Sequence, residues 1–441
     1  MIAWSNVPST GDPARHADSG SVPGFRLLVD KMPALDACEP KKSDQFPYTF
    51  RLRVKKRAFI HVRNLEGAKR LMTGNGVLAP VREVRTLTGL RGVAALWVVS
   101  LHYTIGAGWS GAGFWYAVAA VGNQGVIIFF LLSGYILSYV YETSTARHPL
   151  ATYAPFMWAR IARIYPLHLV TLVAWGGLIA LGLVPRLPGD TPVTFVQNLL
   201  LVQAWGFTGD TSWNALSWTV SIELFCYLLF PFVAFALARR SVLFCAAVLG
   251  ISLACVGFVP YDRLLRLVGL SRDLPLSYGF YVSHFGFLFL AGMALQRVTA
   301  WLHATVPHQR LFDLHLLVGL WIVMVHAHPP VFDWTIAVGS SLVIIGISTD
   351  SGLGQLLFGN RLMVFLGEIS YALYLTHGMF RLVFHHYAPA VSLPVTALLA
   401  LLFAVVVHYL VERPARAALR RLLPRLDGFK IPAPSSGVLG S

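Results

Sequence analysis

The chain has 441 residues, of which 56% are hydrophobic and only 12% are charged. This composition excludes an ordinary soluble protein, which needs far more polar surface, and it indicates a membrane protein with many spans. The formal net charge of +15 does not indicate a nucleic-acid-binding protein, because all lysines but one precede residue 70 and an arginine cluster closes the last apolar run.

Residues 1–80 differ from the rest of the chain because they are polar and include the basic run RLRVKKR at 51–57. They lack the apolar core and the cleavage site of a signal peptide. We expect either a poorly ordered cytoplasmic extension or sequence upstream of a true start at Met72, and we assign no chemistry to this segment. At the other end, residues 417–441 are expected to form a short basic cytoplasmic tail.

Ten apolar runs predict ten transmembrane helices, because a helix needs roughly 20 apolar residues to cross the hydrocarbon core. An even number of spans places both termini on one side, and the distribution of arginines between the loops favours the cytoplasm, with residues 260–275 as the exception. The predicted fold is therefore an all-α polytopic integral membrane protein with both termini in the cytoplasm. The predicted spans are 87–106, 121–141, 164–184, 214–237, 241–259, 276–297, 312–327, 331–348, 361–385 and 392–411.

The first span carries two ionisable residues, Arg91 near its start and His102 near its end. Eleven helical residues turn the chain by about 1100°, so the two side chains lie on one face, separated by about 16 Å along the axis. Ionisable groups at this depth are costly and usually face a protein interior or a watery cavity. The alternative is that Arg91 reaches the membrane surface and His102 is only a hydrogen-bonded packing residue.

The stretch ARIARIYP at 159–166 places Arg160 and Arg163 just before the third span. They are either topology anchors at the lipid headgroups or a grip for the phosphate groups of a cytoplasmic ligand, which the planar guanidinium binds well.

The fourth span carries Glu223 near mid-bilayer, within WNALSWTVSIELF at 213–225. A carboxylate in hydrocarbon takes up a proton or needs a cationic partner, for which Arg91 and His102 are the candidates. An ion pair that only holds helices together is the alternative.

The ninth span contains LGEISYALYLTHG at 366–378, in which Ser370, Tyr374 and His377 occupy helical positions i, i+4 and i+7. This spacing predicts one polar stripe, as in the wall of a buried cavity. Hydrogen bonding between helices without chemistry fits Ser370 and Tyr374 equally well.

Cysteines and histidines show no metal-binding spacing. Cys226, Cys245 and Cys255 fall in apolar runs, where we interpret them as small packing residues. The sequence has no CxxC and no HExxH motif, so we expect no metal site.

Five motifs together resemble those of the acyltransferase family 3 proteins, in the same order. They are RTLTGLRGVAALWVVSLHY, GVIIFFLLSGYILS, ARIARIYPLH, WNALSWTVSIELFCYLLFP and LGEISYALYLTH, followed by VERPAR at 411–416. The resemblance covers residues 84–416, which we interpret as the ten-span acyltransferase membrane domain. It implies an enzyme of the bacterial cytoplasmic (inner) membrane that transfers an acyl group, commonly acetyl, from acyl-coenzyme A to a hydroxyl. The acceptor is usually a sugar, since members modify polysaccharides, lipopolysaccharide, peptidoglycan, nodulation factors and macrolides.

The resemblance also implies partners and residue roles. The expected partners are acyl-coenzyme A as co-substrate, a carbohydrate or glycolipid acceptor and membrane lipid, with no permanently bound cofactor and no nucleic acid. At the matching positions, Arg91, His102 and Glu223 would be catalytic, and Arg160 and Arg163 would bind the donor. Many members have a second acidic residue directly after the first, but this sequence has none directly after Glu223. The residues expected to line the cavity are Ser133, Trp218, Ser221, Ser370, Tyr371, Tyr374 and His377.

We hypothesise that His102 is the general base that takes the proton from an acceptor hydroxyl, because an ordinary imidazole pKa of about 6.5 leaves a basic fraction near neutral pH. Glu223 would orient the imidazole or stabilise its charged form, unless it is the base itself. A transporter or flippase that uses the buried charges for substrate or proton passage is the alternative of another class. A membrane scaffold or receptor with structural ion pairs is a third.

Overall fold

The computed structural model divides the chain into two units, Met1–Glu83 with Pro432–Ser441, and Val84–Ile431. In the first unit, β1 (Phe50–Val54) pairs antiparallel with β2 (Ala58–Val62). No secondary structure was predicted here, although FRLRV alternates apolar and basic residues with the period of a strand. The structure describes residues 50–54, 58–62, 84–105, 113–145, 149–207, 212–258, 277–306, 309–327, 333–349, 352–388 and 391–422.

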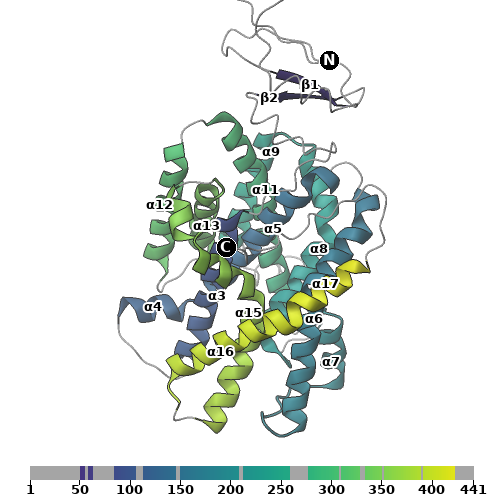
Figure 1. Ribbon diagram of the computed structural model, residues 1–441, viewed down its shortest axis with the longest axis vertical. Helices are drawn as coiled ribbons and strands as arrows, with labels where there is room; N and C mark the ends of the chain where they lie inside the picture. The colour runs from purple at the N-terminus through teal and green to yellow at the C-terminus, as the bar shows by residue number, and fades with distance from the viewer. Residues whose placement is uncertain are drawn as a thin grey trace, which may run out of the picture. The chain divides into compact units, whose positions relative to one another are not determined.

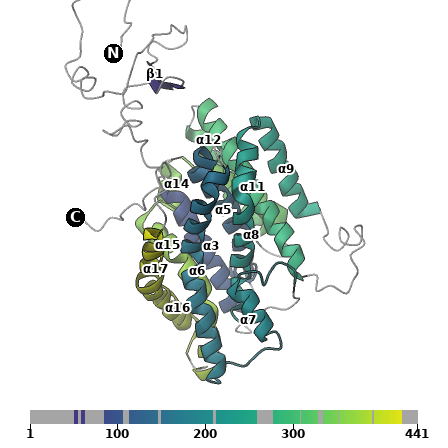
Figure 2. The same ribbon diagram turned by 90° about the vertical axis from the view of Figure 1, so that its right-hand side faces the viewer.

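The described part of the second unit is all helical (Figures 1 and 2). Each predicted span coincides with a helix of its own. The helices are α3 (Arg85–Ile105), α4 (Phe114–Ala120), α5 (Gln124–Thr145), α6 (Pro149–Ala180), α7 (Pro192–Leu199), α8 (Trp218–Ala238), α9 (Val242–Phe258), α11 (Ser277–Thr305), α12 (Gln309–His326), α13 (Asp333–Ile347), α14 (Gly352–Leu357), α15 (Arg361–Tyr387), α16 (Leu393–Val407) and α17 (Arg413–Arg421), with a 3₁₀ turn η2 (Ala215–Ser217) and a π-helical turn η3 (His408–Glu412).

Five helical stretches of the described residues are long and apolar enough to cross a membrane. Two shorter helices, Val242–Gly257 and Asp333–Ile347, are also apolar. The count of ten crossings and the cytoplasmic position of both termini stay predictions. The five stretches are Gln124–Tyr141, Pro149–Ala180, Ala215–Ala238, Val282–Thr305 and Leu393–Arg421.

Polar and apolar residues are distributed as expected for a protein surrounded by lipid. Large apolar side chains lie on the outside, with Leu243 78% exposed and Leu410 72% exposed. Ser370 and His377, in contrast, are fully buried in the interior. Polar groups inside and apolar groups outside are typical of helices that pack around a polar site within a membrane.

Helix α6 begins at Pro149, well before the predicted limit of residue 164. Arg160 and Arg163 therefore lie within this helix and not in front of it. The prediction began the span after the arginines, because charged residues count against a position in hydrocarbon. In the fold both guanidinium groups have partners in the protein interior, so the helix continues past them.

Helices α3 and α15 pack side by side through glycines. A methyl group on Gly367 would lie 1.8 Å from the carbonyl oxygen of Thr88, and one on Gly92 would lie 2.8 Å from the backbone nitrogen of Gly367. Further along, Tyr103 and His377 are again in contact, so the two helices run parallel. Small residues at such crossings are typical of membrane helices, because they let the backbones approach closely.

Candidate functional site

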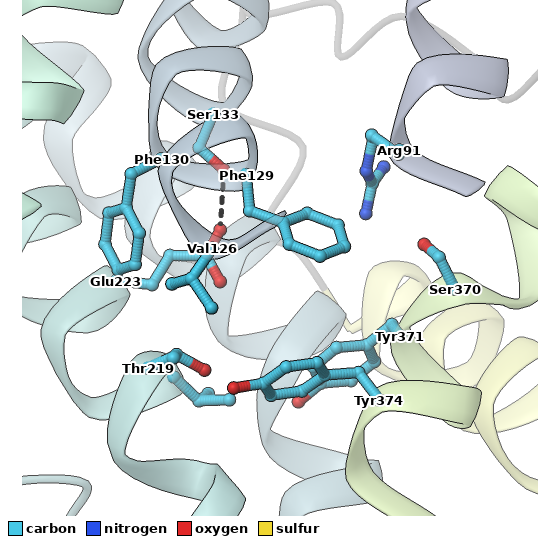
Figure 3. A pocket seen from close by; sticks show the side chains of 11 residues that line it. Arg91, Val126, Phe129, Phe130, Ser133, Thr219, Glu223, Ser370, Tyr371 and Tyr374 are labelled. Carbon is cyan, nitrogen blue, oxygen red and sulfur yellow. Dashed lines mark hydrogen bonds between the residues drawn. The ribbon is translucent and has the colours of Figure 1, made fainter. Parts of the chain in front are cut away.

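A cavity lies between α3, α5, α8 and α15 (Figure 3). It encloses about 540 Å³ of space not filled by atoms, part of which is open to the surroundings. Aromatic and aliphatic walls with a few convergent polar groups are usual for a small-molecule site. The lining residues are Arg91, Val126, Phe129, Phe130, Ser133, Thr219, Val220, Glu223, Ser370, Tyr371 and Tyr374.

Six of the predicted site residues therefore line one cavity, and six do not. Those in the lining are Arg91, Ser133, Glu223, Ser370, Tyr371 and Tyr374. Those outside the lining are His102, Arg160, Arg163, Trp218, Ser221 and His377.

Glu223 projects from α8 and is held by two hydroxyl groups. The Ser133 hydroxyl donates to Glu223 Oε1 at 3.0 Å (Figure 3), and the hydroxyl of Tyr227, one turn further along α8, donates to the same oxygen. Within the described residues, neither Arg91 nor His102 hydrogen-bonds to this carboxylate. The cationic partner expected for Glu223 is thus replaced by hydroxyls from α5 and α8.

Arg91 projects from α3 toward the cavity (Figure 3). Its guanidinium makes no hydrogen bond or ion pair with any residue that the structure describes. A half-buried arginine without a protein partner leaves its donors available to a ligand in the cavity.

The two arginines of α6 lie behind the aromatic wall of the cavity. Arg160 donates to the Tyr141 hydroxyl at 3.0 Å, and its guanidinium lies 5.9 Å from the ring of Tyr227. Arg163 forms a buried ion pair with Glu412 and lies 5.3 Å from the ring of Tyr371, which lines the cavity. Both arginines therefore contact the tyrosines that form or support the cavity wall, and Arg163 is already neutralised by a carboxylate.

Helix α17 brings further arginines to α6. The indole nitrogen of Trp158 donates to the Leu419 carbonyl at 2.8 Å, and the C-terminal helices α16 and α17 run obliquely across α15 and α6 (Figure 1). Arg160, Arg416 and Arg420 each bury a guanidinium Nε that has no hydrogen-bond partner among the residues that the structure describes. Such orphaned donors indicate a place for water or a polar ligand. From the sequence, the C-terminal arginines were interpreted only as topology information.

His102 pairs with His377. Nδ1 of His102 lies 2.9 Å from the Val98 carbonyl oxygen and 3.3 Å from Nε2 of His377. The His377 ring is fully buried and lies 6.1 Å, between centroids, from the ring of Tyr374 in the cavity wall. The histidine pair thus adjoins the cavity through Tyr374. The group beside His102 is a second imidazole, not the carboxylate of Glu223 that was expected to orient it.

Trp218 and Ser221 lie on other faces of α8 than Glu223. Trp218 packs on Phe285, which in turn packs on the cavity residue Phe130. Ser221 is fully buried and donates to the Leu201 carbonyl at 2.8 Å, which fastens α8 to the preceding loop. Successive helical residues are rotated by about 100°, so neighbours of Glu223 cannot all face the same cavity.

No group of three histidine, cysteine, aspartate or glutamate residues within the described ranges has the geometry to hold a metal ion.

A family model described as an acyltransferase domain, that of acyltransferase family 3, matches residues 84–413. The chain belongs to acyltransferase family 3. The match extends from the start of α3 to the start of α17, so it includes the cavity, the histidine pair and both arginines of α6.

Among curated proteins, this family member is similar to acyltransferase MdmB from Streptomyces mycarofaciens. The two chains are 36% identical over 192 residues, which cover 41% of this chain and 48% of the relative. The aligned part thus spans about half the length of that curated relative. No solved structure matches the chain. The family match confirms the resemblance found from the five motifs, and acyl transfer is the reaction class that it supports.

Two polar residues that were not predicted from the sequence contact residues of the candidate site. Tyr227 follows Glu223 by four residues, a spacing that places both on one helical face and was available as a signal. Glu412 lies in VERPAR and is buried, although a carboxylate at the end of an apolar run resembles an interfacial residue. Its partner Arg163 is 249 positions away, so no local pattern reveals the pair.

Proposed function

We propose that this membrane acyltransferase moves an acyl group, in the simplest case acetyl, from acyl-coenzyme A to a hydroxyl of a carbohydrate or glycolipid in the bacterial inner membrane. The proposal rests on one arrangement of residues around the cavity. Near one end of α3 an arginine is free to bind a ligand, and near the other end lies the histidine pair. The two ends differ in chemistry, as the phosphate and thioester ends of a coenzyme A donor do.

In the proposed reaction, Nε2 of His102 removes the proton from the acceptor hydroxyl as the oxygen attacks the thioester carbonyl. The tetrahedral intermediate then collapses, the carbon–sulfur bond breaks, and the proton passes from His102 to the departing coenzyme A thiolate. General base catalysis of this kind contributes about 10²- to 10⁴-fold to a rate. Glu223, held by two hydroxyls, would be a hydrogen-bond acceptor that orients the acceptor substrate in the cavity.

The donor phosphates are proposed to lie near Arg91, Arg160, Arg416 and Arg420. Three of these arginines carry an unpartnered buried Nε, and Arg91 has no partner among the described residues. Guanidinium groups bind phosphate oxygens through parallel hydrogen bonds. Eleven helical residues separate Arg91 from His102 by about 16 Å, so the pantetheine arm would extend along α3 toward the histidine pair.

The test is transfer of labelled acetyl groups from acetyl-coenzyme A to a glycan extract of the host membrane, measured with the purified protein in lipid nanodiscs. His102→Ala should reduce transfer by at least about 100-fold at unchanged protein abundance. His386→Ala, which removes an exposed histidine of α15, is the control and should retain full activity. Full transfer by His102→Ala would refute the base assignment.

The alternative predicted from the sequence is a transporter or flippase, in which buried arginine, histidine and carboxylate residues also occur; the family match supports acyl transfer. The same nanodisc protein, reconstituted in sealed vesicles, distinguishes the two functions. Movement of a labelled glycolipid across the bilayer without any acyl donor would support transport, whereas a covalently acylated product that requires the donor supports acyl transfer.

A further inference from the structure

The tautomer of His377 follows from its surroundings. Nδ1 of His377 lies 3.0 Å from the Leu373 carbonyl oxygen, which can only accept a hydrogen bond, so Nδ1 carries the proton. The ring is fully buried, and no carboxylate contacts it among the residues that the structure describes. A buried imidazole without an anionic partner is neutral, because burial disfavours its charged form. Its Nε2 is therefore an acceptor.

The tautomer of His102 follows in turn. Its Nδ1 lies 3.3 Å from the accepting Nε2 of His377 and 2.9 Å from the carbonyl oxygen of Val98. Both neighbours are acceptors, so Nδ1 of His102 carries a hydrogen that it shares between them. The other ring nitrogen, Nε2, is left with a free lone pair. This is the nitrogen that the proposed function uses as the base.

We propose that His377 is the positioning residue of His102, the role that a carboxylate has in many hydrolytic sites. This inference rests on the proposed function of His102 as the base. The Val98 carbonyl belongs to the same helix turn as His102 and alone leaves the ring free to tilt. The bond to His377 comes from another helix, fixes the ring plane and becomes a charge-assisted bond when His102 takes up the proton.

The packing of α3 against α15 sets this contact. Gly92 meets Gly367 at the close crossing, and His102 and His377 each follow their glycine by ten residues. Because the helices run parallel, equal spacing from the crossing brings the two rings to the same level. The other titratable or charged groups near the pair are Tyr103 of α3 and Tyr374 and Arg381 of α15. None of these three described residues carries a carboxylate that would substitute for His377.

The test compares His377→Ala, His377→Gln and His377→Asn by acetyl transfer over a range of pH. His377→Ala should lower kcat by about 10- to 100-fold with KM for acetyl-coenzyme A changed by less than about twofold. The acidic limb of its pH profile should move to lower pH, because the protonated form of His102 loses a partner. The amide oxygen of glutamine reaches the position of Nε2, so His377→Gln should recover most of kcat, whereas the shorter asparagine should not.

A second readout does not depend on turnover. Diethylpyrocarbonate modifies only the unprotonated imidazole, and mass spectrometry gives the extent of modification of His102 as a function of pH. In His377→Ala the midpoint should move to lower pH. An unchanged midpoint together with unchanged kcat would overturn the positioning role, and equal loss in the glutamine and alanine variants would make His377 a packing residue. If wild-type protein transferred no acetyl group while the midpoint still moved, the proposed function would fail and the histidine pairing would stand.

Discussion

Gly367→Ala tests whether the packing of α3 against α15 determines the contact between His102 and His377. The added methyl group would lie 1.8 Å from the Thr88 carbonyl oxygen, whereas ordinary van der Waals contact begins at about 3.4 Å. The clash is with backbone, so no side-chain rotation relieves it, and α3 and α15 must separate locally by about 1.6 Å. His102 and His377 lie about 15 Å further along the two helices, and their nitrogens are only 3.3 Å apart. Even a third of that separation would lengthen the contact beyond a hydrogen bond.

The expected result is a loss of kcat for acetyl transfer of about 10- to 100-fold, the same range as for His377→Ala. The matched control is Gly250→Ala in α9, where a methyl group would meet no atom within 4 Å, and it should behave like wild type. Protein abundance and thermal unfolding are measured for each variant, since separation of two buried helices also lowers stability.

The double variant Gly367→Ala/His377→Ala tests whether Gly367 acts through the histidine pair. If the glycine acts through the histidine pair, the second change adds little to the first, because residues that act as a unit are strongly non-additive. Losses that multiply would show that the glycine affects catalysis by another route. Wild-type kcat for Gly367→Ala at normal abundance would refute the idea that the crossing holds the pair.

Three further changes test other parts of the site. Glu412→Gln leaves the buried guanidinium of Arg163 without its carboxylate, so unfolding in detergent should require about 3–5 kcal/mol less, and a stability equal to wild type would contradict a buried pair. Arg420→Ala should raise the KM for acetyl-coenzyme A about tenfold or more, because it removes a hydrogen bond to a charged group. The control Arg421→Ala removes an exposed arginine and should leave this KM unchanged. Equal KM values for the two variants would show that α17 does not bind the donor. Tyr227→Phe removes one of two hydroxyls from the cavity carboxylate and should lower kcat about tenfold, which initial rates at saturating donor would measure.

The positions of the helices could be predicted because length and apolarity determine each helix separately. All ten predicted spans coincide with helices, and the largest error in a limit is at α6. There the predicted span began after the arginines, because they were treated as charges outside the membrane. In the structure Arg163 pairs with Glu412, which is far away in the sequence. A local sequence pattern cannot reveal such a distant partner. The prediction therefore treated the paired charge of Arg163 as an exposed one. The β1–β2 hairpin was missed because no secondary structure was predicted for this polar segment, although the apolar and basic residues of FRLRV alternate with the period of a strand.

The composition of the site could be predicted better than its pairings. Helical spacing placed Ser370, Tyr374 and His377 on one face of α15, and the structure has the first two in the cavity wall and the third beside it. Spacing could not show that His102 meets His377 and not Glu223. Which polar groups meet depends on how neighbouring helices are offset, and that offset is set by where glycines permit close approach.

The spacing of eleven residues between Arg91 and His102 has a structural explanation in this packing. Arg91 is adjacent to the glycine crossing, where α15 is closest and the cavity is lined by Ser370 and Tyr371. His102 lies three helical turns further on, at the level where α15 presents His377. The rise of α3 thus sets the distance of His102 from Arg91, and the close crossing sets which residue of α15 meets His102. A donor bound at Arg91, as we propose, would extend along the same helix that carries the proposed base, and the contact between α3 and α15 would orient that base.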